Sequence, residues 1–412
     1  MQNNHYHTLI VGGGPGGILA ALSAREQGRE VFLVEQNEKL GKKLYITGKG
    51  RCNLTNACDS QTFFSNIIRN PRFMYSALYG FDQQALMNLV EAEGCPLKIE
   101  RGERVFPVSD KSSDIIRALQ KALQKRGVQI MLNTRVENIM LDSAGTMAVG
   151  VALKTGQKIT ADKIVMATGG ITYRSTGSDG SGLAMVKKLG HHIIPCRPSL
   201  TGLETREGWP ARAQGLTLKN VDVSLWHNEK DIKTIRGEVL LTHFGVSGPV
   251  ILSMSAFIEQ DPQAYHLTLD LKPALSDQQL NDRVLRDFEE FNNKDLDNAL
   301  VQLLPGKMIP IVLNLSELDV RKKVNQITKA ERKKLIYRLK HLELQVTDYY
   351  DTNAAIVTAG GVDVKEVDPK TMASKKIDHL FFAGEMLDVD GLTGGFNIQI
   401  AASTGYAAGR ES

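Results

Sequence analysis

A glycine-rich stretch near the start of the chain constrains its fold more than any other feature. It follows a short apolar segment, residues 8–11, and precedes a run of small residues with helical character. The first glycine of a G-x-G-x-x-G pattern permits a tight turn, the second lets the backbone approach a pyrophosphate, and the third lets the helix pack closely on the strand. Free N–H groups at the start of the helix then face the phosphates. We therefore predict a dinucleotide-binding βαβ unit whose contacts include Gly12, Gly14, Pro15, Gly16 and Gly17.

An acidic residue follows the second strand of this unit. Residues 31–34 form a continuous apolar run, which is typical of a strand buried in a parallel sheet. Glu35 lies 18 residues beyond Gly17, where a carboxylate can accept a hydrogen bond from a ribose hydroxyl. Gln36 comes next, and we include it among the predicted contacts. An acid here disfavours a phosphorylated ribose, so the pattern favours NAD or FAD over NADP without separating the first two.

The rest of the chain predicts a discontinuous α/β fold. Residues 72–93 and 111–126 have the periodicity of amphipathic helices. Alternating runs after residue 195 are typical of antiparallel strands, whereas residues 276–340 are charged, amphipathic and mostly helical. We expect a Rossmann-like domain from residues 1–195 and 345–412, an inserted β domain from residues 196–275 and 341–344, and a helical subdomain from residues 276–340.

Composition argues against several other classes of protein. The 412 residues include 50 basic and 46 acidic side chains, a weak excess without a basic tail, so no nucleic-acid partner is expected. No apolar run reaches the length of a membrane span, and the first residues lack the pattern of a signal peptide. The four cysteines form no C-x-x-C motif, which fits a reducing cytoplasm. The adjacent His191 and His192 have no third ligand at metal spacing, so no metal site is predicted.

Segments spread over nearly the whole chain resemble the YhiN/BaiN-like flavoproteins, a family that includes aminoacetone-oxidase-like FAD enzymes. The matching segments are Gly41–Leu44, Thr47–Asn56, Val165–Gly170, Pro198–Leu200, Leu241–Pro249, Thr358–Val362 and Phe382–Asn397. The resemblance implies FAD as cofactor, a Rossmann-like FAD-binding domain, an inserted β-barrel-like domain and a small helical subdomain. Many members have an aspartate where this chain has Ser181, so no role is carried over to that position.

The resemblance and the local chemistry together indicate further cofactor contacts. Lys42, Lys43 and Arg51 offer positive charge to a pyrophosphate. Asn53 offers hydrogen bonds to a ribityl chain or flavin edge. Gly394 and Gly395 precede a C-terminal helix, closed by Gly405 or Gly409, whose positive end suits the negative charge of reduced flavin. The further predicted contacts are Lys43, Gly50, Arg51, Cys52, Asn53, Thr55, Val136, Thr168, Gly169, Gly384, Glu385, Asp388, Gly395, Phe396, Asn397 and Gln399.

Residues that would act on a substrate are only weakly marked. His243 follows a strand and could titrate near neutral pH, and Tyr173 and Arg174 stand on a loop rich in glycine and serine. Cys52 has no partner cysteine at disulfide-motif spacing, so we interpret it as a packing thiol rather than a redox thiol. No catalytic acid or base is assigned from the sequence.

The basic clusters of the helical insert are interpreted as a solvated face. Residues 321–323 and 332–334 are basic, but acids interleave with them and no aromatic stacking platform is visible in the sequence. A transfer-RNA-modifying flavoprotein is therefore kept only as a minor alternative.

The function that we predict is that of a cytoplasmic FAD-dependent oxidoreductase acting on a small molecule. Bile-acid-reductase-like members of the resembled family imply a reductase of an activated, enone-like double bond, with NADH or NADPH as transient electron donor. Aminoacetone-oxidase-like members imply instead an oxygen-using oxidase of a small amine. A non-catalytic flavin-binding module is the third alternative. Nothing in the pattern indicates a membrane partner or an oligomeric state.

Overall fold

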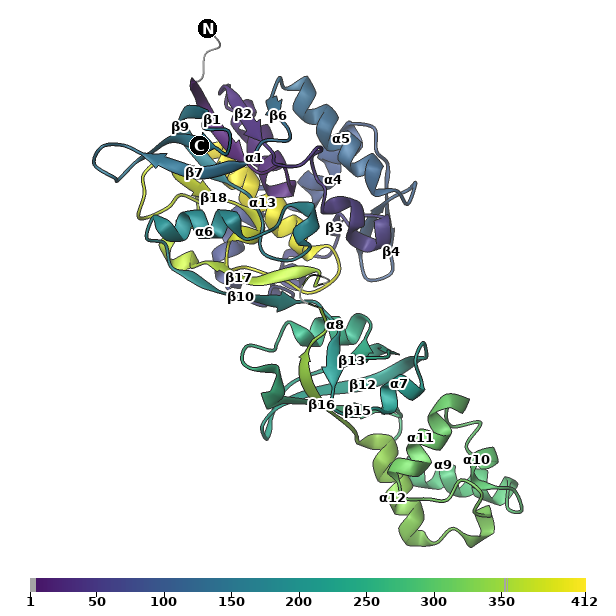
Figure 1. Ribbon diagram of the computed structural model, residues 1–412. Coiled ribbons are helices and arrows are strands. Elements are labelled where there is room, and N and C mark those ends of the chain that lie inside the picture. Colours follow the sequence, from purple (N-terminus) through teal and green to yellow (C-terminus); the bar gives the residue numbers. More distant parts are fainter. Residues whose placement is uncertain (1–4, 352, 354) are drawn as a thin grey trace. The chain divides into compact units, whose positions relative to one another are not determined.

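The computed structural model describes residues 5–351, 353 and 355–412, and the chain divides into two compact units (Figure 1). Unit 1 consists of Met1–Ser199 and Thr352–Ser412, and unit 2 of Leu200–Asp351. Unit 1 is therefore discontinuous, with unit 2 inserted in its sequence. Each unit has a hydrophobic core of its own.

A mixed sheet forms the centre of unit 1. Its strands are β1 His5–Val11, β2 Val31–Val34, β6 Gln129–Met131, β7 Val136–Leu141, β8 Ala148–Leu153, β9 Lys158–Met166 and β18 Leu380–Phe382. The strand order is β6-β2-β1-β9-β8-β7, and β18 pairs with β9 beside this path. Strands β6, β2, β1, β9 and β18 are parallel, whereas β8 and β7 pair antiparallel. This topology confirms the predicted Rossmann-like α/β fold.

The first βαβ unit folds as the glycine pattern predicts. β1 and β2 pair in parallel, and all the residues of β2 are buried. Helix α1, Pro15–Glu26, begins with a proline, whose missing N–H would have no partner in the first turn in any case. Small buried residues dominate α1, and the C-terminal helix α13, Phe396–Glu411, packs against it.

Two glycines bring α1 and α13 into backbone contact. A Cβ on Gly405 would lie 2.1 Å from the carbonyl oxygen of Gly16, and a Cβ on Gly409 would lie 2.0 Å from that of Ala20. No side chain fits at either position. The interpretation that Gly405 or Gly409 ends the helix is therefore wrong, because α13 runs through both and uses them for packing.

The remaining helices of unit 1 confirm the helix predicted over residues 111–126 but not the single helix predicted over residues 72–93. They are α2 Ser60–Ser65, α3 Tyr75–Gly80, α4 Gln83–Ala92, α5 Ser112–Lys125 and α6 Ser181–Lys188. Residues 72–93, predicted as one helix, break at Phe81, where the backbone is extended. The Asp82 carboxylate accepts a 2.8 Å hydrogen bond from the amide of Ala85 and so caps a new helix.

Two small sheets complete unit 1. β3 Thr55–Asn56, β5 Arg104–Pro107 and β4 Leu97–Glu100 form an antiparallel sheet of three strands. β10 Ile193–Ser199 pairs antiparallel with β17 Val357–Val362. This pairing places residues 196–199 in unit 1, whereas the sequence pattern assigned them to the insert.

A closed barrel forms the first part of unit 2. Its strands are β11 Leu203–Thr205, β12 Thr217–His227, β13 Lys230–Leu241, β14 Gly245–Ser247, β15 Tyr265–Asp270 and β16 Leu342–Tyr349, accompanied by the short helices α7 Trp209–Arg212 and α8 Pro249–Ser255. The strand order is β11-β14-β13-β12-β15-β16, and every pairing is antiparallel. Buried and half-buried residues alternate along β15, as expected for a strand with one face on a core. The expected β-barrel insert is confirmed.

Helices form the second part of unit 2. They are α9 Asp277–Glu290, α10 Leu296–Ala299, α11 Ile309–Leu315 and α12 Lys329–Lys340. Capping boxes begin α9, at Ser276 and Gln279, and α12, at Thr328 and Glu331. Among the described residues of both units, no helix is both long and apolar enough to cross a membrane.

Candidate functional site

The glycine loop between β1 and α1 leaves space where a pyrophosphate is expected. Gly12 has φ +106°, and a Cβ on it would lie 2.4 Å from the carbonyl oxygen of Ala167. A Cβ on Gly17 would lie 1.9 Å from the carbonyl oxygen of Gly12. A Cβ on Gly14, by contrast, would meet nothing within 4 Å. Gly12 and Gly17 are therefore required by packing, whereas Gly14 faces open space at the uncapped start of α1.

Glu35 is buried at the end of β2 and is tied to the glycine loop. Its Oε2 accepts a 2.6 Å hydrogen bond from the amide of Gly13. Its Oε1 accepts hydrogen bonds of 2.8 and 2.7 Å from the amide and the side chain of Asn37. A carboxylate has about four acceptor positions, so these three bonds leave room for a further donor such as a ribose hydroxyl.

The loop at residues 174–180 lies over this edge of unit 1. Gln36 Nε2 donates to the carbonyl oxygen of Gly177 over 2.6 Å, and Arg135 forms a 2.9 Å ion pair with Asp179. Val136 is buried at the start of β7 and lines a cavity of about 190 Å³ together with side chains of β7 and α6. The predicted contacts Gln36 and Val136 thus lie at the same edge as Glu35. Their contact with a cofactor stays a prediction.

An ion pair joins two predicted contacts from opposite ends of the chain. Lys43 Nζ lies 2.7 Å from Glu385 Oε2, and Thr172 donates a 3.1 Å hydrogen bond to Glu385 Oε1. The amide of Thr358 donates to the same oxygen over 2.7 Å. Lys43 Nζ also lies 5.8 Å from the centre of the Tyr173 ring. Burial raises the pKa of this half-buried phenol, so Tyr173 stays protonated at neutral pH.

Residues 50–52, which precede β3, make contacts within the protein or adopt a constrained backbone. Arg51 pairs with Glu100 at 2.9 Å and Asp110 at 3.3 Å, and Lys98 pairs with the same two acids, so the contact of Arg51 with a cofactor stays a prediction. Cys52 is fully buried, and burial raises the pKa of its thiol to about 12, which fits a packing thiol. Gly50 has φ +84°, a conformation that disfavours any side chain.

The loop before α13 leaves backbone donors without a side-chain cap. Gly395 occupies the N-cap position with φ +100°, and no side chain bonds to the first amides of the helix. A Cβ on Gly395 would lie 2.3 Å from the carbonyl oxygen of Thr55. Phe396 packs its ring edge-on against Phe63. The helix N-terminus therefore offers N–H groups and the positive end of the helix dipole to an anionic group.

Other polar side chains of this region bond within the fold. Asn397 Oδ1 accepts a 2.9 Å hydrogen bond from the amide of Gly391, and Gln399 Oε1 accepts one of 2.7 Å from the Thr55 hydroxyl. The Thr168 hydroxyl contacts the sulfur of Met386 at 3.1 Å, and the amide of Gly384 donates to Thr404. Gly169, next to Thr168, has φ +77°. These contacts hold the loops in place, and a direct role toward a cofactor stays a prediction.

Two buried carboxyl groups precede α13, and the sequence predicted a role for only one of them. Asp388, a predicted contact, has a buried Oδ1 without a partner among the described residues, and burial raises its pKa. Asp390, which the sequence did not mark, is fully buried, pairs with Arg69 and accepts a 3.1 Å hydrogen bond from Ser199. No local pattern indicates Asp390, because its partners come from distant segments.

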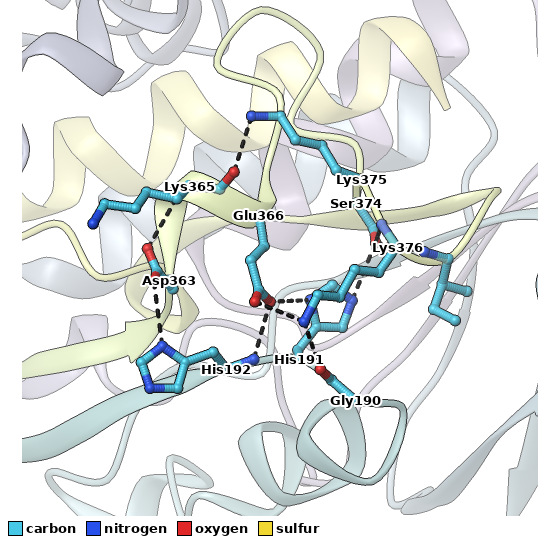
Figure 2. Close-up of polar contacts among 10 residues, drawn as sticks. Gly190, His191, His192, Asp363, Lys365, Glu366, Ser374, Lys375 and Lys376 are labelled. Atoms are coloured by element: carbon cyan, nitrogen blue, oxygen red, sulfur yellow. Dashed lines mark hydrogen bonds and ion pairs between the residues drawn. The ribbon is translucent and has the colours of Figure 1, made fainter.

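The histidine pair of the sequence belongs to a hydrogen-bond network (Figure 2). His191 Nδ1 lies 3.2 Å from Glu366 Oε2, and its Nε2 lies 3.1 Å from the Ser374 hydroxyl. His192 Nδ1 lies 3.3 Å from Asp363 Oδ2. Within the described part of the chain, no group of three histidine, cysteine or acidic residues is arranged to hold a metal ion. The network links the segments on either side of the insert in unit 1.

The catalytic candidates lie in different units. Tyr173 and Arg174 stand on the loop after β9 in unit 1, and Arg174 is exposed. His243 is an exposed residue of unit 2, and its ring lies edge-on to those of Phe244 and Tyr350. Within unit 1, the ring of Tyr173 lies beside Lys43 of the Lys43–Glu385 pair.

Comparison with known families decides the assignment. The profile described as HI0933-like protein Rossmann domain matches residues 6–411. This chain belongs to the HI0933-like family. The resemblance inferred from the sequence motifs is thereby confirmed.

Two curated relatives of this HI0933-like protein match along their full length. The chain is 32% identical over 407 residues to the 3-dehydro-bile acid delta(4,6)-reductase of Clostridium scindens, covering 97% of each chain. It is 28% identical over 408 residues to a ribosomal RNA dihydrouridine synthase of Escherichia coli, covering 98% of each chain. A solved structure with a similar fold is the 3-ketosteroid delta1-dehydrogenase of Sterolibacterium denitrificans, with a TM-score of 0.52, 14% identity and 99% of each chain covered.

The HI0933-like protein is an FAD-dependent oxidoreductase. The residues present fit the cofactor, because Glu35 keeps an acceptor position, Gly14 faces open space, and α13 begins without a cap. Asn53 also has a buried Oδ1 without a partner among the described residues. When bound, FAD supplies hydride transfer, and the protein supplies orientation and charge.

Proposed function

We propose that this protein reduces a carbon–carbon double bond conjugated to a carbonyl group, with NADH or NADPH as the electron donor. The activities for which the two full-length relatives are named support this substrate class. A 3-dehydro-bile acid with delta(4,6) unsaturation has double bonds conjugated to its 3-oxo group. Dihydrouridine is uridine in which the C5=C6 bond, conjugated to C4=O, has been reduced. The two reactions share one chemistry, in which a hydride is added to the β-carbon and a proton to the α-carbon.

The position of Tyr173 beside the Lys43–Glu385 pair is the observation that carries the proposal. The flavin supplies the hydride, so the protein must supply the proton. The phenol of Tyr173 is half-buried beside the Lys43–Glu385 pair, and burial raises its pKa. A protonated phenol suits protonation of an α-carbon or of a developing enolate.

The glycine loop is the one dinucleotide fingerprint that the sequence contains, and it serves FAD in this proposal. A nicotinamide donor would then bind transiently, reduce the flavin and leave before the acceptor enters. An acid at the position of Glu35 does not bear on the choice between NADH and NADPH, because Glu35 is assigned to the ribose of FAD.

The test is an anaerobic titration of the purified, FAD-loaded protein with NADH and with NADPH, following the flavin absorbance. We expect one of them to bleach the flavin and a 3-oxo-4-ene steroid to restore its colour, whereas the saturated 3-oxo steroid leaves it bleached. A flavin that neither nucleotide bleaches, but that aminoacetone bleaches, would favour the amine-oxidase alternative. A flavin that no donor bleaches would favour a non-catalytic module.

A further inference from the structure

The loop at residues 174–180 is held to the edge of unit 1 where Glu35 lies by polar contacts alone. It lies between β9 and α6, and its sequence, RSTGSDG, contains no apolar side chain. Gly177 at its crest has φ +103° and Gly180 at its end has φ +82°, a conformation that glycine adopts without strain. A segment of this kind can leave its place without opening a hydrophobic core.

Two side-chain amides hold the crest of the loop. Gln36 Nε2 donates to the carbonyl oxygen of Gly177 over 2.6 Å, and Asn37 Nδ2 donates to that of Thr176 over 2.9 Å. Asn37 Nδ2 also donates to Glu35 Oε1 over 2.7 Å. Because an amide nitrogen has two hydrogens, the side chain that orients the acid of the nucleotide site also fastens the loop. The fit is close, since a Cβ on Gly177 would lie 2.5 Å from Asn37 Nδ2.

An ion pair holds the end of the loop. Arg135, directly before β7, lies 2.9 Å from Asp179 Oδ2 and donates a 3.3 Å hydrogen bond to Gln36 Oε1. The other oxygen of Asp179 accepts a 2.9 Å hydrogen bond from the amide of Ser181 at the start of α6. Burial would raise the pKa of Asp179, but the bonds from Ser181 and the charge of Arg135 outweigh burial and lower it. The side chain of Arg135 is 44% exposed, so water can replace its partner when the loop lifts. Gln36, Asn37 and Arg135 together are called the latch below.

We propose that residues 174–180 form a strap that closes over the adenosine end of FAD and must open for FAD to enter or leave. The latch residues come from the two segments that contain the predicted contacts Glu35 and Val136. Opening costs a few polar contacts near the surface, so it can occur while the rest of unit 1 stays folded. The proposal concerns exchange of the cofactor and is independent of the acceptor that the protein reduces.

A latch has a kinetic signature that a direct cofactor contact lacks. Its contacts join protein groups to one another, so they form with or without FAD. If FAD passes only through the open form, weakening the latch raises the rates of FAD binding and FAD release by the same factor and leaves the dissociation constant unchanged. A side chain that contacts FAD itself would instead raise the release rate and the dissociation constant together.

The test uses Arg135→Gln, which removes the ion pair with Asp179 and leaves the hydrogen bond that caps α6. Binding is followed by stopped flow, from the change in FAD fluorescence on mixing with apoprotein, and release by the same signal after dilution far below the dissociation constant. We expect both rates to rise about 3- to 10-fold, the size for loss of a half-exposed ion pair and one hydrogen bond. Arg135→Lys, which keeps the charge, should show a smaller rise. Arg117→Gln is the matched control, because it removes an exposed arginine that pairs with Asp114 on α5 at 3.0 Å.

Limited digestion with trypsin reports the opening itself. Arg174 is exposed on the strap, but a protease must draw several residues into its own site, so cleavage after Arg174 follows the population of the open strap. We expect FAD-loaded Arg135→Gln to be cut there about 3- to 10-fold faster than the parent. Cleavage after Arg101, exposed between β4 and β5, should keep its rate. Gly177→Ala is a second variant, whose Cβ would push the latch amides away and should raise the same rates.

The proposal is overturned if Arg135→Gln, shown to be folded by its melting curve, binds and releases FAD as the parent does. It is also overturned if only release is faster and the dissociation constant rises in proportion, which would make Arg135 a direct contact. Equal changes in Arg117→Gln, or no faster cleavage after Arg174 in either strap variant, would also refute it. If Arg135→Gln does not fold, Gly177→Ala decides by the same measurements. Enone reduction by the same preparations reports on the proposed function separately, and its absence leaves the strap unaffected.

Discussion

Lys43 and Glu385 form a 2.7 Å ion pair although most of the chain separates them in sequence. Lys43 follows the first βαβ unit, and Glu385 follows β18. The parallel sheet brings the two together, because the carboxyl ends of β1, β2, β9 and β18 meet at one edge.

Breaking this pair should weaken retention of the flavin. We expect Lys43→Met to raise the dissociation constant of FAD by about tenfold or more, because hydrogen bonds to charged groups contribute about 1.5–3 kcal/mol. The measurement is FAD fluorescence on titration of the apoprotein. Lys42→Met is the matched control, since Lys42 pairs with the exposed Glu38 and lies one residue away. Equal affinity in the two variants would contradict a role for Lys43 at the cofactor.

Gly14 and Gly17 should respond differently to a side chain. Gly14→Val is expected to fold but to lose its FAD, because its Cβ meets nothing in the protein and would fill the space of the pyrophosphate. Gly17→Ala places a Cβ 1.9 Å from the carbonyl oxygen of Gly12 and should cost about 1–3 kcal/mol or more of stability. Melting curves and bound flavin, measured on both, distinguish the two effects. A yellow Gly14→Val protein would argue against the assignment of this loop.

Tyr173→Phe should slow the acceptor half-reaction and leave flavin reduction unchanged. General acids contribute about 10²- to 10⁴-fold to such proton transfers, so the reoxidation rate by an enone should fall within that range. Stopped-flow measurement of both half-reactions is the test, with Tyr79→Phe, a change at an exposed tyrosine of α3, as the control. Because the phenol of Tyr173 has a raised pKa, activity that depends on its proton should persist above the ordinary value of 10.0.

His191 should make the protein less stable as the pH falls. Burial lowers the pKa of His191 below 6.5, so the unfolded chain binds a proton at a higher pH than the folded one. Stability is therefore complete above pH 6.5 and is lost as the pH falls from there through the lower folded pKa. The groups that face the ring are Glu366, Ser374, Phe382 and Lys376.

The hydrogen bond between Ser374 and His191 also favours the neutral imidazole in the folded protein. The Ser374 oxygen already accepts hydrogen bonds from the amides of Lys376 at 3.0 Å and Ile377 at 2.9 Å, so its own proton is directed at His191 Nε2. A doubly protonated ring would lose that bond. Thermal melts of the parent and of His191→Gln between pH 5 and 8 are the measurement. We expect a smaller fall in melting temperature for the variant, and parallel curves would refute the assignment.

The sequence by itself determined the features that are local. The spacing of Gly12, Gly14 and Gly17 between two apolar runs predicted the βαβ unit, and the second apolar run placed Glu35 directly after its second strand. Alternation after residue 195 predicted strands, and the barrel followed from the family resemblance. Turns, caps and periodicity are encoded over a few residues, so a single sequence carries them.

Only the tertiary structure decided which side chains and backbone atoms from distant segments are in contact. Gly405 looks like a helix end in the sequence, but it is the place where the backbone of α13 meets Gly16 of α1. Arg51 was predicted as a cofactor contact, and only the fold shows that it also pairs with Glu100 and Asp110. The Arg69–Asp390 pair and the Lys43–Glu385 pair likewise join segments that are distant in the sequence, and no local pattern records them. A side chain's partner is fixed by topology and packing, and these form only when the whole chain folds.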